Sequence, residues 1–407
     1  MHVFPKKLGA FNQYFWTREL VAANAIIFWA ELEGALEQQA LQSALALVQA
    51  KYPLLRTKVE KKPGVLPSFV ENSTPIELRV VESEKDSGIA QVIETEMAKG
   101  SDQSLFRVVL LRYGSVRSTL MFVANHAVTD ARGLTFILRD LLLALNGEPL
   151  GPPVDTIMTH EELLNEPSMQ DFIQTLPPGS PYPATGAAQM KSQRSAFAAT
   201  EVLHPTEVSA VLNRAREEQT TVQGALMAAL AISASGIKTE WRDGRVLQML
   251  VPVDLRRFRP GEESTDLLAH PAFVSIHQKE AGSFWELARA CKRSLDELVT
   301  LDAARAFIRQ SHQLLAVEWE PQAFFDATNS GLPHELFMSN LGDVAIPDGY
   351  GALRLQKVGF STLSGPAPTQ SICAATFQGW MSLSLVSYQP LEGLLQGMRQ
   401  LLAEASL

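Results

Sequence analysis

One stretch in the first half of the chain combines a core pattern with reactive side chains. Leu120 to Ala124 form a continuous apolar run, which is typical of a strand buried on both faces. The polar pair Asn125 and His126 follows at once. From Leu134 to Leu145, apolar residues recur at the spacing that an amphipathic helix requires. The pattern therefore predicts a core strand, a short polar turn and a core helix.

The chain before residue 150 mixes further strands and helices. A short helix is expected within 8–16. The expected strands cover 25–32, 56–60, 68–71, 77–81 and 105–112, and the expected longer helices cover 36–48 and 89–99. The tight link at Gly114 and Ser115 predicts that the strand at 105–112 forms an antiparallel hairpin with the strand that ends at Asn125. Strands and helices do not alternate regularly and no GxGxxG motif occurs, which argues against a Rossmann fold.

Residues 148–195 contain eight prolines and one short helical signal, at 161–175, which is the composition of a linker. We therefore expect an N-terminal half (1–150), a crossover linker (151–195) and a C-terminal half (196–407). In the C-terminal half the expected strands cover 196–203, 245–253, 272–277, 337–340, 353–358, 371–377 and 381–387, and the expected helices cover 205–216, 221–234, 284–299, 303–317 and a segment from 391. The predicted fold class is α/β of the mixed, α+β type.

Composition and charge narrow the function. The 407 residues are 46% apolar and 19% charged, as in an ordinary globular protein. The net charge of −9 argues against nucleic acid as a partner, which would favour a basic face. Arg256, Arg257 and Arg259 form one basic cluster, which is either a solvated face or a patch for a phosphate-bearing donor. Cys291 and Cys373 are too few for a disulfide framework, and no metal-ligand spacing occurs, so no metal is expected.

The sequence predicts a cytoplasmic protein. The N-terminus lacks the apolar run of a signal peptide. The most apolar later window, Thr221 to Ile237, is interrupted by Gln223 and is too short to span a bilayer, so it is interpreted as a core helix. No transmembrane segment is expected.

The turn after the core strand carries the candidate chemistry. A neutral imidazole can accept a proton from a hydroxyl or an amine near pH 7, and His126 lies four residues before Asp130. No GxSxG nucleophile motif accompanies the pair, so His126 would act on the substrate directly. The alternative interpretation is a histidine at a strand end whose hydrogen bonds are purely structural.

The motif around this turn resembles a known signature. Asn125-His126-Ala-Val-Thr-Asp130-Ala131 is similar to the His-His-x-x-x-Asp-Gly signature of the CoA-dependent acyltransferase superfamily. This superfamily includes chloramphenicol acetyltransferase, plant BAHD acyltransferases, the condensation domains of peptide synthetases and the mycobacterial polyketide-associated (Pap) acyltransferases. The second histidine of the signature, which is the general base, matches His126. Asn125 replaces the first histidine, and Ala131 replaces the glycine, although Gly133 lies close by.

Three more segments carry the resemblance, in the right order along the chain. Lys51 to Thr57 resembles the His-Pro-x-Leu-Arg-Thr segment of condensation-type domains. Val251 to Arg257 resembles the Pro-Val-Asp/Asn-Leu-Arg strand of the second half. Ser339 to Gly342 resembles the Ser-Asn-x-Gly segment of Pap-type enzymes.

The resemblance implies two chloramphenicol-acetyltransferase-like halves, each a mixed sheet flanked by helices, with a tunnel between them. It implies an acyltransferase that moves an acyl group from acyl-CoA or an acyl-carrier protein to a hydroxyl, with His126 as general base. CoA or phosphopantetheine would be a co-substrate, with no cofactor bound permanently. A small-molecule alcohol or amine would be the acceptor, in secondary or lipid metabolism.

The resemblance also suggests roles for neighbouring residues. Asp130 would turn away from the cleft and pair with an arginine, for which Arg256 is the candidate; the alternative is that Asp130 orients His126. The candidates for binding the oxyanion or lining the cleft are Asn125, Ser339, Asn340 and Gly342.

Some assignments stay open from the sequence. Phe15 and Trp16 either line the acceptor channel or pack in the core. Five histidines are expected in loops or on helices without a catalytic role: His160, His204, His270, His312 and His334. His277 is expected at the surface. The alternative functions are an amide-forming condensation enzyme acting on carrier-bound substrates and a non-catalytic binding relative.

Overall fold

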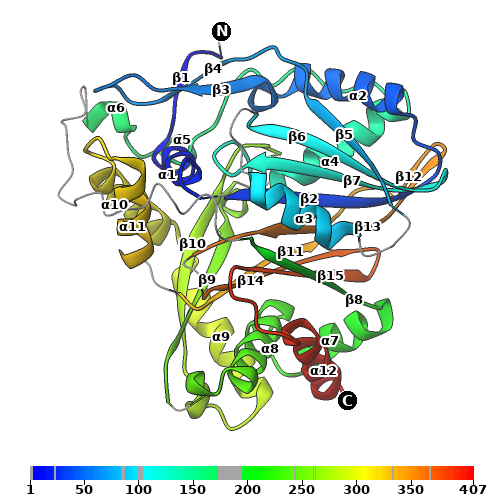
Figure 1. Cartoon of the computed structure of the whole chain (residues 1–407). Coiled ribbons are helices and arrows are strands. Elements are labelled where there is room, and N and C mark those ends of the chain that lie inside the picture. The colour runs from blue at the N-terminus through cyan, green and yellow to red at the C-terminus, as the bar shows by residue number, and fades with distance from the viewer. Residues whose placement is uncertain are drawn as a thin grey trace.

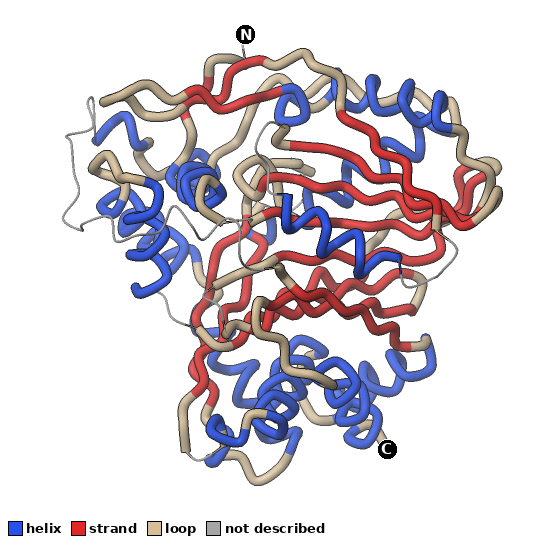
Figure 2. The backbone as a smooth tube through the Cα atoms, viewed as in Figure 1, coloured by secondary structure: helices blue, strands red, loops and turns tan. Residues whose placement is uncertain are grey.

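The computed structural model describes residues 3–22, 24–83, 88–99, 104–172, 195–242, 244–259, 261, 263–331, 334–365 and 368–407. Within them, two six-stranded sheets lie against each other, and helices cover their outer faces (Figures 1 and 2). The predicted mixed architecture is confirmed.

The first sheet has the strand order β12-β13-β2-β7-β6-β5. Its strands are β2 (Ala25–Glu33), β5 (Glu77–Glu82), β6 (Phe106–Tyr113), β7 (Arg117–Asn125), β12 (Gly349–Tyr350) and β13 (Leu353–Thr362). The predicted hairpin is present, because β6 and β7 pair antiparallel with Leu110 opposite Leu120. Two strands from residues 349–362 thus extend a sheet that is otherwise built from residues 25–125.

The second sheet has the strand order β10-β9-β11-β14-β15-β8. Its strands are β8 (Phe197–Leu203), β9 (Leu247–Asp254), β10 (Ala269–Ile276), β11 (Leu336–Asp343), β14 (Gln370–Phe377) and β15 (Trp380–Ser387). Strand β11 runs parallel to β9 and β14, whereas the other pairs are antiparallel. A small sheet of β1 (Lys6–Lys7), β4 (Ser68–Glu71) and β3 (Thr57–Glu60) lies near the N-terminus.

Helices cover both faces of the first sheet and one face of the second (Figure 1). In the first part of the chain they are α1 (Ala10–Glu19), α2 (Gln38–Lys51), α3 (Gly88–Lys99), α4 (Ala131–Leu145), α5 (His160–Leu164) and α6 (Met169–Phe172). In the second part they are α7 (Pro205–Glu217), α8 (Val222–Ile237), α9 (Phe284–Leu298), α10 (Leu301–Leu314), α11 (Pro321–Gly331) and α12 (Leu394–Ala405).

The layers explain why the central strands β2, β6 and β7 of the first sheet carry long apolar runs. On β2, Phe28 and its alternate neighbours face α2 and α4, whereas Ile27 and Trp29 face α3. Because both faces are buried, the alternation of apolar and polar residues disappears. Helices α7, α8, α9 and α12 pack together on the outer face of the second sheet.

Two predictions from the sequence need correction, and one helix was not predicted. The helical signal at 161–175 is two short helices, α5 and α6, because Asn165 adopts a left-handed conformation (φ 53°) and Pro167 follows; residues 173–175 lie outside the described residues. Helix α11 was not predicted, since its apolar residues are few and clustered. His270, expected in a loop or on a helix, lies in strand β10.

Of the crossover linker that was expected at 151–195, the described residues include only 151–172 and 195. Among the described residues, no helix is by itself long and apolar enough to cross a membrane, although α7 and α8 together reach the length and composition across a 104° bend. The described residues include no group of three or more potential metal ligands.

Candidate active site

The loop between β7 and α4 is held in place by hydrogen bonds from three directions. The side chain of Asn12, on α1, donates to the carbonyl of Ala127 (2.7 Å). Asn125 is buried, and its Oδ1 accepts the N–H of Ala127 (2.8 Å). The hydroxyl of Thr129 donates to the carbonyl of Thr265 in the second half of the chain (2.7 Å). The loop therefore has a fixed shape.

His126 has a defined tautomer in this loop. Its Nδ1 lies 3.1 Å from the carbonyl oxygen of Thr129. Because a carbonyl can only accept, Nδ1 must carry the proton, and Nε2 keeps its lone pair. Among the described residues, Nε2 has no hydrogen-bond partner.

The surroundings of His126 favour the neutral ring. Burial lowers the pKa of His126, and the charge of Asp130 opposes this shift without reversing it. The ring of Phe15, on α1, stacks on the imidazole with the centroids 4.2 Å apart and the planes 18° from parallel. The neutral form of the imidazole is thus favoured, and an aromatic ring packs against one face of it.

Asp130 faces away from His126. Its Oδ1 caps α4 by accepting the N–H of Gly133 (2.8 Å), and its Oδ2 accepts from Arg256 (3.0 Å) and from the N–H of Leu268 (2.8 Å). Asp130 is 4% exposed and Arg256 is 6% exposed, so this is a buried ion pair. The guanidinium of Arg256 and these hydrogen bonds hold the pKa of Asp130 below its usual value, against the effect of burial. Arg256 is the partner that the resemblance suggested.

Arg256 joins the loop to the second half. Its guanidinium also donates to the carbonyl of Ser264 (2.9 Å), the carbonyl of Asp266 (2.6 Å) and the carboxylate of Asp254 (2.9 Å). A charge with this many partners is fixed in position. The His126 loop is therefore anchored across the junction of the two sheets.

Two cavities meet at His126. The empty space is about 730 Å³ in the first and about 530 Å³ in the second, and both figures include space that is open to solvent. Both are lined by His126, Pro252, Ala269, Phe337 and Thr362. The imidazole therefore lies at the junction of two spaces that could hold two reactants.

The second cavity contains two of the candidate oxyanion residues. Ser339 and Asn340, in the middle of β11, line it together with Asp130 and Arg132. Gly342 is placed elsewhere, because its N–H donates to Oδ1 of Asn340 (2.9 Å) and it lines neither cavity. Asn125 also lines neither cavity, since its amide is used inside the loop.

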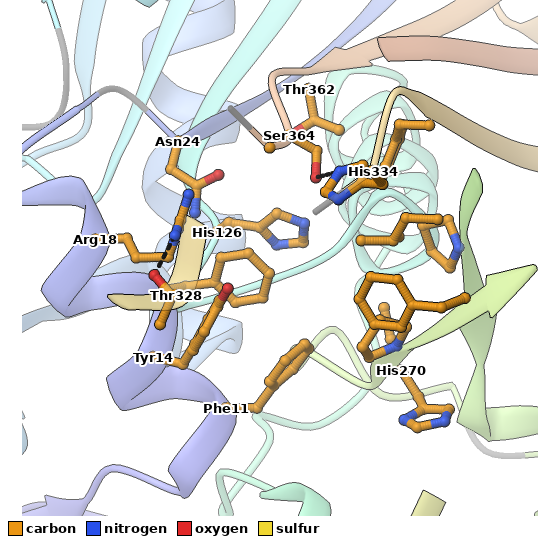
Figure 3. Close-up of a pocket in the computed structure, with 18 of the residues that line it drawn as sticks. Phe11, Tyr14, Arg18, Asn24, His126, His270, Thr328, His334, Thr362 and Ser364 are labelled. Atoms are coloured by element: carbon orange, nitrogen blue, oxygen red, sulfur yellow. Dashed lines mark hydrogen bonds between the residues drawn. The ribbon is translucent and has the colours of Figure 1, made fainter. Parts of the chain in front are cut away.

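The first cavity is rich in aromatic residues and includes residues that sequence reasoning missed. Figure 3 shows the ring of His126 reaching into a space bordered by Phe11, Tyr14, His270 and His334. His270 and His334 stood outside every motif and come from β10 and the segment before β11. No signal near them in the sequence indicates that they approach His126, because only the pairing of the second sheet brings them there.

Helix α1 forms one wall of the first cavity, and its sequence has a feature that could have indicated this role. Phe15 lines the cavity, whereas Trp16 lines a different pocket. The polar residues Asn12 and Arg18 are buried in this helix. Buried polar residues within an aromatic segment are unusual, and this pattern could have marked α1 as part of the site.

The remaining motif segments have other contacts. Lys51 forms an ion pair with Asp140 of α4, and the hydroxyl of Tyr52 donates to the same carboxylate (2.6 Å). Through Lys51 and Tyr52, the segment from Lys51 to Thr57 therefore connects the end of α2 to α4. His277 is exposed, as predicted.

The comparisons with known proteins concern the family and the fold of the chain. The family model for the condensation domain matches residues 24–158. The cyclosporin synthetase of Tolypocladium inflatum is 30% identical over 114 residues, which are 27% of this chain and 1% of that protein. The beauvericin synthetase of Beauveria bassiana is 28% identical over 115 residues, 4% of its length. The chain thus spans only a small part of these relatives.

Solved structures resemble the whole chain. Polyketide synthase associated protein 5 from Mycobacterium tuberculosis superposes with a TM-score of 0.67 at 17% identity, covering 100% of this chain and 99% of that one. The trichothecene 15-O-acetyltransferase of Fusarium sporotrichioides gives 0.71 at 13% identity, covering 98% and 94%. The first condensation domain of the CDA synthetase gives 0.70 at 14% identity, covering 100% and 97%.

These matches confirm the fold that the resemblance implied. The chain has the fold of the CoA-dependent acyltransferase superfamily. The match to the condensation-domain family model covers residues 24–158, which include the His126 loop and α4.

Proposed function

We propose that this protein is an acyltransferase that moves an acyl group from a thioester to a hydroxyl, with His126 as the general base. The observation that supports it most is the hydrogen bond from Nδ1 of His126 to the carbonyl of Thr129, which leaves the basic Nε2 at the junction of two cavities. A base needs this lone pair within reach of the proton that it removes. The fold shared with acyltransferases and condensation domains supports the same reaction class.

In the proposed reaction the acceptor occupies the aromatic first cavity, and the thioester enters through the second. Nε2 of His126 takes the proton of the acceptor hydroxyl as the oxygen attacks the thioester carbonyl. The tetrahedral intermediate then expels the thiolate, which takes the proton from Nε2, so that an ester and a free thiol are released. A positioned base contributes about 10²- to 10⁴-fold in rate.

Donors for the developing oxyanion are available in the second cavity. Ser339 and Asn340 are half-buried there, and among the described residues the Ser339 hydroxyl has no hydrogen-bond partner. Oδ1 of Asn340 accepts the N–H of Gly342, which turns its NH₂ group away from that bond. We propose that Ser339 and Asn340 hydrogen-bond the oxyanion, which stabilises the charge that forms in the transition state.

The thioester is a co-substrate in this proposal, either acyl-CoA or an acyl group on a carrier-protein phosphopantetheine. Arg132 borders the second cavity and donates to the carbonyl of Leu341. Its side chain is 28% exposed, so it can also reach a phosphate at the mouth.

Amide formation is the second candidate, because the family match over residues 24–158 is to condensation domains. The same base would then deprotonate an amine.

The experiment that tests the proposal incubates the protein with acyl-CoA thioesters and a panel of alcohols and amines, and follows free thiol by absorbance and products by mass spectrometry. Ester products with alcohols are expected. Amide products alone would favour the second candidate, and thiol release that requires no acceptor would contradict acyl transfer.

A further inference from the structure

The described lining of the first cavity has one permanent charge and no opposite charge. Among the described residues that line it, Arg18 is the only side chain that is always ionised, and no aspartate or glutamate is present. The second cavity differs, because Arg132 and Asp254 lie 3.7 Å apart there. The first cavity is therefore a positively charged space that is rich in aromatic residues.

Arg18 has no counter-ion among the residues that the structure describes. It is 8% exposed, and its guanidinium donates to the hydroxyl of Thr328 and to Oδ1 of Asn329 (2.9 Å), both on α11. These are neutral acceptors, and no described carboxylate pairs with Arg18. The adjacent Glu19 does not line the cavity, and its Oε2 accepts the N–H of Asn24.

Aromatic rings also surround the guanidinium. Its Cζ lies 4.7 Å from the ring centroid of Phe325 and 5.5 Å from that of Tyr14. Cation–π contacts and neutral hydrogen bonds make a buried cation tolerable, but they leave its charge uncompensated. Figure 3 shows Arg18, Thr328 and Tyr14 grouped at one side of the cavity, with the ring of His126 reaching into the same space.

We infer that the ligand of the first cavity carries a carboxylate, which Arg18 binds, on an apolar body that the aromatic walls enclose. Resting on the proposed function, this makes the acceptor an apolar hydroxy acid, with its hydroxyl at His126 and its carboxylate at Arg18. A planar guanidinium in a desolvated site binds a carboxylate by short, charge-assisted hydrogen bonds. A purely structural Arg18, which clamps α1 to α11, would stabilise the fold without distinguishing an acid from its ester.

The test measures binding without any thioester. Wild-type protein is titrated calorimetrically at pH 7.5 with 3-hydroxydecanoate and with its methyl ester, and then with 3-(4-hydroxyphenyl)propanoate and its methyl ester. The acid and the ester of each pair share the same carbon skeleton and differ in the charge of the carboxyl group. At least one acid is expected to bind roughly ten- to a hundredfold more tightly than its ester. Equal affinities within both pairs, or no binding of either acid, would overturn the inference from the wild-type protein alone.

Three variants assign the preference to Arg18. In Arg18→Gln the ratio of the affinity for the acid to the affinity for the ester should fall to about one. Arg18→Lys, which keeps the charge, should retain part of the preference for the acid. Arg354→Gln, which removes an arginine that is 67% exposed on β13, should leave the ratio unchanged. A ratio that survives in a folded Arg18→Gln protein would refute the role of Arg18, and if that variant fails to fold, the wild-type and Arg18→Lys ratios decide.

The result is independent of the reaction. If binding shows the acid preference but no thiol is released with any acceptor, the proposed function fails and the carboxylate site stands. If thiol release occurs with alcohols and no acid preference exists, the proposed function stands and the carboxylate site fails.

Discussion

At the scale of single residues, the geometry of the site depends on the atom to which each polar group is hydrogen-bonded. The Nδ1 proton of His126 is directed to the Thr129 carbonyl, and the carboxylate of Asp130 is directed to Arg256. Hydrogen bonding to a main-chain carbonyl fixes the tautomer of the ring without any help from Asp130. Asp130 therefore holds the loop in position, and the two roles considered from the sequence can be separated by experiment.

Asp130→Asn should destabilise the whole protein, and a loss of activity should follow from that. The substitution leaves the buried Arg256 without a charged partner, which typically costs about 3–5 kcal/mol in the free energy of unfolding. Urea unfolding of this variant measures the cost. Asp302→Asn is the matched control, because the side chain of Asp302 is 94% exposed and should matter little. A variant of wild-type stability with a collapsed rate would instead show that Asp130 orients His126.

His270 should make the fold sensitive to mild acid. Burial lowers its pKa to about 4, whereas in the unfolded chain it titrates near 6.5. Between these values the unfolded state binds the proton and the folded state does not, so stability is lost as the pH falls from 6.5 towards 4. At pH 5 the loss from this group is about 2 kcal/mol relative to pH 7.

His270→Gln should remove that contribution. Unfolding free energies at pH 7 and pH 5 should differ less in the variant than in the wild type. The exposed His277 provides the control substitution, His277→Gln, which should keep the wild-type difference. An identical pH dependence in the His270 variant and the wild type would contradict the assignment.

The individual residues also show where sequence reasoning ends. His126 and Arg256 could be identified because each lies in a motif that resembles a family pattern. Arg18, His270 and His334 lie in no motif, and they meet only because α1, β10 and the segment before β11 converge on one cavity. Convergence of distant segments depends on tertiary packing, which neither local spacing nor periodicity encodes.

At the scale of elements, the N-terminus of α4 explains a departure from the family signature. Ala131 stands where the signature has glycine, but Gly133, two residues later, is the position without room for a side chain. A Cβ on Gly133 would lie 2.5 Å from the carbonyl oxygen of Thr265 and 2.6 Å from the hydroxyl of Thr129. The close approach of α4 to the second half therefore requires glycine at 133.

Gly133→Ala should displace the loop that carries His126. The added methyl group collides with main-chain and hydroxyl oxygens, so stability should fall by about 1–3 kcal/mol and catalysis should fall with it. Gly236→Ala is the matched control, because that glycine lies in α8 and its nearest neighbour would be 4.0 Å away. An alanine there should be neutral or slightly stabilising. Thermal unfolding of both variants, with a thiol-release assay, compares them. Equal stability of the two would refute the steric argument.

Most elements could be predicted from periodicity, and the exceptions have physical reasons. The strand at 117–125 and the helix at 131–145 follow from a continuous apolar run and a regular helical spacing. Helix α11 was missed because it buries few apolar residues and uses Thr328 and Asn329 for polar contacts with Arg18. Strand order could not be predicted at all, since pairing between distant strands leaves no mark within either strand.

At the scale of the whole molecule, β12 and β13 connect the two parts of the chain. Strand β13 pairs with β2 of the first sheet and packs against β14 and β15 of the second. Opposite Trp29 of β2 lies Gly359, where a Cβ would come within 2.3 Å of the indole ring. The two sheets are thus coupled through one strand, and the cavities lie where they meet.

Gly359→Ala should weaken this coupling. The methyl group would force Trp29 away from its fully buried position, at a cost of about 1–3 kcal/mol. Gly349→Ala, in β12 of the same sheet, adds a methyl group with no atom within 4 Å and should have little effect. Tryptophan fluorescence and circular dichroism during urea unfolding report the change. A Gly359 variant that unfolds at the same urea concentration as the Gly349 variant would contradict the proposed coupling.

The central claim is that the imidazole of His126 is the base that makes the acceptor reactive. The most direct measurement is the rate of acceptor-dependent thiol release from an acyl thioester by wild type, His126→Gln and the surface control His277→Gln, each checked for a native unfolding transition. The account predicts a fall of about 10²- to 10⁴-fold for His126→Gln and no change for His277→Gln. Wild-type rates of thiol release in a folded His126→Gln protein would contradict it.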